Sequence, residues 1–126
     1  MNEFNQQLVE RMQKEIEGYE AKKARFAETF EGSPVYAISN YGEDMMVSNL
    51  VVAGFGNIIT RAGTEGEDEM RALSAYLLED AERALLKSVF GHNSTSALKN
   101  VENLAQAEAF RRRRVIFREV LGLGTY

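Results

Sequence analysis

Apolar residues recur at alternating steps of three and four along the first thirty residues, which is the spacing of one helical face. The sequence therefore predicts a single long helix over residues 3–31. The positions on that face are Val9, Met12, Ile16, Tyr19, Lys23, Phe26 and Phe30. Because the same spacing fits the a and d positions of a heptad, two interpretations stay open. The face covers the protein's own core, or it forms a seam between subunits.

The next segment, residues 32–42, contains Pro34, the only proline of the chain, together with two glycines. Proline and glycine are the strongest local breakers of regular structure. We therefore expect a connector here, with an extended piece at residues 35–39.

Residues 43–62 fit two different structures. Their apolar residues share one helical face, and Asn40 with Glu43 fits a capping box, so a helix is the favoured prediction. Against it, the stretch is rich in valine and isoleucine and contains Gly54 and Gly56, each of which costs a helix about 1 kcal/mol relative to alanine. The alternative is a small three-strand meander over residues 35–60.

Two further periodic segments predict a helical hairpin over residues 65–121. The first helix begins at the capping-box pattern of residues 64–67 and ends before Gly91, and the second ends before Gly122. His92 lies in the short turn between them. The whole chain of 126 residues is thus expected to be one mainly α domain of four helices with a C-terminal αα-hairpin. If the meander forms instead, the class is α+β.

Composition then narrows the chemistry. The absence of cysteine excludes a disulfide framework and thiolate metal sites, and a single histidine excludes a two-histidine zinc motif. We expect no metal and no cofactor. The net charge of -4 disfavours binding to duplex nucleic acid, which requires a broad basic surface. No signal peptide and no membrane-spanning stretch is apparent, so we expect a cytoplasmic protein.

Four consecutive arginines, residues 111–114, stand out in this acidic chain. On a helix, Arg111, Arg114 and Arg118 share an edge, and a second apolar strip of Phe110, Phe117 and Leu121 lies beside it. One interpretation is charge compensation. A hairpin folded at residues 92–93 would bring Arg118 near Glu67 and residues 111–114 near residues 71–74. The arginines would then face the acidic cluster of Glu65, Glu67, Asp68 and Glu69.

The second interpretation is anion recognition. Guanidinium forks of Arg111, Arg114 and Arg118 match phosphate, and Phe110 or Phe117 could stack on a base. This predicts a binder of a nucleotide-like small anion or of nucleic acid.

No residue set suggests catalysis, so the favoured function is non-enzymatic: a small accessory protein that forms a homo-oligomer and binds a partner protein through helical surfaces. The predicted interface residues come from the heptad face and the second apolar strip. They are Val9, Met12, Ile16, Tyr19, Phe26, Phe30 and Leu121.

Overall fold

The computed structural model describes residues 1–90 and 97–124, and within these residues the protein is mainly α, as predicted, with no strand. Five helices follow one another along the chain. They are α1 (Glu3–Gly32), α2 (Pro34–Val52), α3 (Phe55–Ala62), α4 (Glu67–Phe90) and α5 (Ala97–Val120).

The predicted connector over residues 32–42 is wrong, because only Ser33 separates α1 from α2. Pro34 is the first residue of α2. At that position a helix leaves the backbone N–H unpaired in any case, so proline starts a helix there instead of breaking one. The extended piece at residues 35–39 and the meander over residues 35–60 are absent from the described structure for the same reason.

The helix expected at residues 43–62 is present but divided. Its break lies at Ala53 and Gly54, and Gly54 has a φ of 85°, a left-handed conformation that glycine adopts without steric cost. The turn redirects the chain so that Phe55, the first residue of α3, is buried with 1% of its surface exposed. The glycine that weakened the helix prediction therefore sets a helix boundary.

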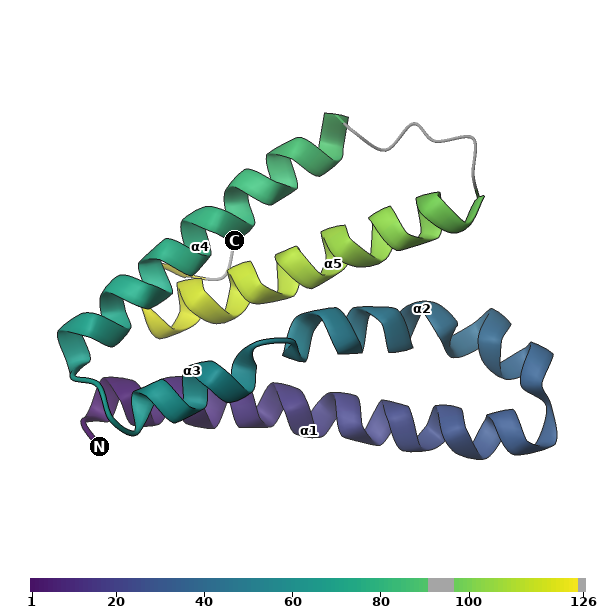
Figure 1. Ribbon diagram of the computed structural model, residues 1–126, viewed down its shortest axis with the longest axis horizontal. Coiled ribbons are helices and arrows are strands. Elements are labelled where there is room, and N and C mark those ends of the chain that lie inside the picture. Colours follow the sequence, from purple (N-terminus) through teal and green to yellow (C-terminus); the bar gives the residue numbers. More distant parts are fainter. Residues whose placement is uncertain (91–96, 125–126) are drawn as a thin grey trace.

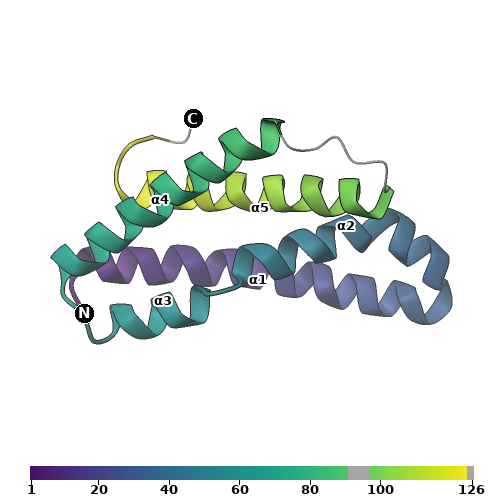
Figure 2. The same cartoon turned by 45° about the horizontal axis from the view of Figure 1, so that its top comes forward.

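The helices lie in two layers. The long α1 runs the length of the molecule, α2 returns along its C-terminal half, and α3 continues along its N-terminal half (Figure 1). Helices α4 and α5 form the second layer, in which α5 lies over α2 (Figures 1 and 2). Helices α4 and α5 pack closely near the start of α4 and separate toward the end of α4 (Figure 1). The predicted turn, including His92, lies outside the described residues.

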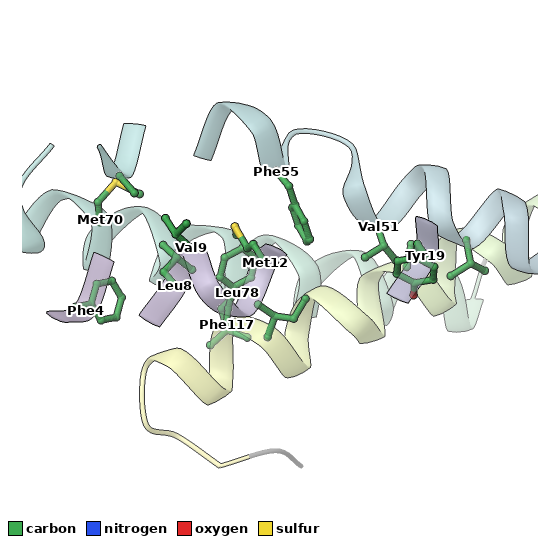
Figure 3. Close-up of a cluster of buried hydrophobic side chains, with 14 of the residues drawn as sticks. Phe4, Leu8, Val9, Met12, Tyr19, Val51, Phe55, Met70, Leu78 and Phe117 are labelled. Carbon is green, nitrogen blue, oxygen red and sulfur yellow. The ribbon is translucent and has the colours of Figure 1, made fainter. Parts of the chain in front are cut away.

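All five helices contribute to one hydrophobic core (Figure 3). Its largest fully buried apolar side chains are Leu8, Met12, Val51, Phe55, Met70, Ile116 and Phe117. Val9 and Tyr19 are each 9% exposed, and Ile16 packs against the core while partly exposed. The first four of the seven positions on the heptad face therefore cover the protein's own core. Met12 and its neighbours cannot form a subunit seam while they are buried there.

Asn5, which the sequence pattern did not single out, connects α1 to the end of α3 and to the link that leads into α4. Its side chain is fully buried, and Nδ2 donates to the carbonyl of Ala62 at 3.1 Å and to that of Glu65 at 2.9 Å. These carbonyls lie at the end of α3 and in the link to α4, where helical partners are missing. Asn5 therefore fixes the α3–α4 link against the start of α1.

The α2–α3 segment is also the one part of the described chain that is long and apolar enough, by length and composition alone, to cross a membrane. In this structure Val47, Val51 and Phe55 of that segment are buried against the other helices. These are the minority, because only 28% of the apolar window is buried inside the structure.

Candidate functional site

The four consecutive arginines of α5 point in four directions, because each residue of a helix turns about 100° from the previous one. Each guanidinium reaches a different partner. The pairs are Arg111 with Glu108 of α5, Arg112 with Glu15 of α1, Arg113 with the carbonyl of Leu50 in α2, and Arg114 with Glu82 of α4. The arginine run therefore ties α5 to three other helices.

On the side facing α1, the ion pairs form a connected network. Glu15 accepts hydrogen bonds from Arg112 and from Arg11, with N···O distances of 2.9 Å for both ion pairs. Arg11 also pairs with Glu119 of α5. Partial burial on its own would raise the pKa of Glu15, but the hydrogen bonds from Arg11 and Arg112 outweigh it, so that the pKa of Glu15 is lowered from its usual value.

On the α4 side, Glu82 lies between two arginines, 3.3 Å from Arg114 and 3.8 Å from Arg118. Arg118 also donates to the carbonyls of Leu123 at 2.6 Å and Gly124 at 3.1 Å. These bonds fix the chain as it leaves the C-terminal end of α5.

The predicted register of α4 against α5 is wrong. Arg114 pairs with Glu82 and not with residues 71–74, and Glu67 pairs with Arg71 of its own helix. Similarly, Glu65 pairs with Arg61 one turn earlier. The register was inferred from a tight turn at residues 92–93, whereas α4 and α5 separate toward that end and α5 begins only at Ala97. The arginines are therefore compensated, but by Glu15, Glu82 and Glu108 and not by the predicted acidic cluster.

The residues expected to bind an anion are not brought together on one open surface. Arg111 pairs with Glu108 on the exposed face of α5, while Arg114 and Arg118 share Glu82. Phe117 is 2% exposed and belongs to the core, so it cannot stack on a base. Leu121 is partly buried against the same core.

Phe110 instead lines a pocket of about 270 Å³ between α3, α4 and α5. Its wall is mostly apolar, with Phe55, Ile58, Leu73 and Leu77 among the lining residues. Arg113 also lines it, and desolvation by burial lowers the pKa of that guanidinium despite the nearby charge of Asp80. This arginine was not among the predicted anion-binding residues, because a sequence cannot show where a pocket opens.

A second, polar cleft of about 620 Å³ lies between α1, α2 and α5. It is lined by charges of both signs, including Lys14, Lys22, Asp44 and Glu108. Because neither sign dominates, the cleft does not select a charged ligand. Among residues 1–90 and 97–124, no three histidine, aspartate or glutamate side chains are grouped so that they could hold a metal ion.

The corner between α1 and α2 lies at one end of the molecule (Figures 1 and 2). It carries a group of exposed apolar side chains. We call this group the apolar tip, and its members are Phe30, Val35, Tyr36 and Ile38, with 42%, 77%, 55% and 58% of their surfaces exposed. Phe26, partly exposed, stacks beside Phe30 with ring centroids 5.8 Å apart. Of the predicted interface residues, Phe26 and Phe30 are thus the ones that remain at the surface away from the core.

Comparison with protein-family models, with curated proteins and with solved structures found no match to this chain. The site must therefore be interpreted from its own chemistry.

Proposed function

We propose that this protein is a non-enzymatic accessory protein that self-associates through the apolar tip and presents its helical surfaces to a partner protein. The exposure of Val35 and Ile38 is the observation that supports it most directly. Soluble monomers seldom leave a contiguous group of large apolar side chains in water, and such groups mark interaction sites.

The position of the tip favours contact with another copy of the chain. It lies at the far end of the longest helix pair, where α1 and α2 extend away from the core residues (Figure 1). Phe26 and Phe30 continue the heptad spacing that is used in the core farther back along α1. Two copies meeting about a two-fold axis would bury the same patch on each.

The alternative function, binding of a nucleotide-like anion or nucleic acid through Arg111, Arg114 and Arg118, has less support. Each of these guanidinium groups already pairs with a carboxylate. A phosphate would have to displace Glu108 or Glu82, and the net charge of -4 adds repulsion.

The test is sedimentation velocity over a range of protein concentrations, with two matched substitutions. Ile38→Glu places a charge in the apolar tip, and Tyr76→Glu places one on α4 at a side chain that is similarly exposed, 62% against 58%. We expect wild type and Tyr76→Glu to form an oligomer and Ile38→Glu to remain monomeric. A monomeric wild type at every concentration, or the same association in both variants, would contradict the proposal.

The partner protein is tested separately. Wild type and Ile38→Glu, each immobilised through an N-terminal tag, are exposed to lysate and the retained proteins are identified by mass spectrometry. We expect a protein that both baits retain, because the partner surface lies outside the tip. Retention of no protein above the level of an empty support would contradict this part of the proposal.

A further inference from the structure

The pocket between α3, α4 and α5 has the composition of a small-molecule site. Its volume of about 270 Å³ is close to the lower limit of roughly 300 Å³ for ligand pockets. Aromatic and aliphatic side chains form most of its wall, and the charged groups are few. They are Arg113, Arg61 and Asp80.

Arg113 differs from its neighbours in the arginine run. Arg111, Arg112 and Arg114 each have a glutamate within 4 Å, whereas among the described residues Arg113 has no carboxylate within that distance. One of its N–H groups donates to the carbonyl of Leu50, and its guanidinium carbon lies 5.5 Å from the centre of the Phe110 ring. A guanidinium has five N–H donors, so four have no acceptor among the described residues.

This arrangement has a structural role and leaves a chemical capacity. Leu50 is close to the end of α2, where helix carbonyls lose their own partners, and Arg113 caps that carbonyl. The cap uses a single donor. A half-buried cation facing an apolar cavity is costly unless an anion compensates it.

The other two charged groups of the pocket do not compensate Arg113 at close range, and Arg61 is itself a cation. Arg61 pairs with Glu65 at 3.1 Å. Asp80 is exposed and forms no ion pair within 4 Å of Arg113. Arg113 therefore lines the pocket with N–H donors that have no acceptor among the described residues.

We propose that this pocket binds a small amphipathic anion whose aromatic or alkyl body lies against Ile58, Leu77 and Phe110 and whose acidic group pairs with Arg113. The acidic group is a carboxylate, sulfonate or phosphate, since each accepts a guanidinium fork. This site is separate from the apolar tip, so ligand binding in the pocket does not depend on self-association.

Two fluorescent probes that differ by one acidic group test the proposal. The probe 8-anilinonaphthalene-1-sulfonate carries a sulfonate, and N-phenyl-1-naphthylamine is its neutral counterpart. We expect wild type to bind the sulfonate saturably and about 10-fold more tightly than the neutral probe, the contribution of a charge-assisted contact. Arg113→Met should remove this preference and leave binding of the neutral probe within about twofold of wild type.

Further variants distinguish binding in the pocket from binding elsewhere on the surface. Asn57→Trp, at an exposed residue of the pocket rim, should weaken both probes, and Asp80→Asn should strengthen the sulfonate alone. The Asp80→Asn result decides the question if Arg113→Met does not fold. Absence of saturable sulfonate binding, an unchanged preference in Arg113→Met, or no effect of Asp80→Asn would each overturn the proposal. So would binding that Ile38→Glu abolishes, because the probe would then lie on the apolar tip.

Discussion

Arg112 of α5 and Glu15 of α1 form an ion pair of 2.9 Å although 97 residues separate them in the chain. The Glu15 side chain is only 10% exposed and accepts a second ion pair from Arg11. A carboxylate held between two arginines, one from each helix, joins the first and last helices of the protein. Arg112 of the arginine run thus has a structural role that requires no ligand.

Removing this contact should destabilise the fold more than removing its exposed neighbour. Arg112→Met takes away two hydrogen bonds to Glu15 and should lower the free energy of unfolding by about 1–3 kcal/mol. Arg111→Met, whose pair with Glu108 lies in solvent, should change it by no more than about 0.5 kcal/mol. Urea unfolding of the two variants is the measurement, and equal losses would refute the distinction.

Acid should act through the same residue. The pKa of Glu15 is lower in the folded protein than its usual value of 4.5, so the unfolded state binds the proton more readily. The stabilisation is complete above pH 4.5 and is lost as the pH falls through the lower, folded-state pKa. Melting temperatures of wild type and Glu15→Gln, measured between about pH 6 and pH 3, should converge as the pH falls. Parallel curves would exclude Glu15 as a source of acid sensitivity.

Asn5 should matter far more than its exposed neighbour Gln6. Asn5→Ala leaves the carbonyls of Ala62 and Glu65 without their donor, which should cost about 2–3 kcal/mol of stability. Gln6→Ala removes only a surface hydrogen bond to Glu10 and should cost less than about 0.5 kcal/mol. Thermal unfolding compares them, and similar stabilities would show that the α3–α4 link does not depend on Asn5.

Substitution of the two phenylalanines of the second apolar strip should lower the stability by different amounts in the same thermal unfolding assay. Phe117→Ala opens a cavity in the core and should cost about 3–5 kcal/mol. Phe110→Ala enlarges a pocket that already exists, so the loss should be clearly smaller. A larger loss for Phe110 than for Phe117 would reverse the assignment of core and pocket.

The sequence predicted helices well wherever apolar periodicity was long. The predicted bounds of the first helix, residues 3–31, differ from α1 by one residue at its C-terminal end. The wrong prediction of a connector over residues 32–42 has a simple physical cause. Proline breaks a helix when it lies in the interior, but it can start a helix when it is the first residue. Here α1 ends at Gly32 and α2 begins at Pro34, so that the proline starts a helix.

Tertiary details were less accessible. Helical spacing placed Arg111, Arg114 and Arg118 on one edge of α5, but it did not show their partners. Arg111 pairs with Glu108 of its own helix, whereas Arg114 and Arg118 pair with Glu82 of α4. Glu15 gave no signal in the spacing of the sequence. Arg113 was overlooked because its environment depends on the break between α2 and α3 and on the pocket that α3, α4 and α5 enclose.

The most direct test of the central claim uses the absence of cysteine from the chain. A pyrene maleimide attached at Val35→Cys places a fluorophore in the apolar tip, and one at Gln13→Cys places it at an exposed position of α1 away from the tip. If copies meet through the tip, excimer emission will rise with protein concentration for the label at position 35 and stay absent for the label at position 13. No excimer at position 35, or equal excimer emission at both positions, would contradict the account.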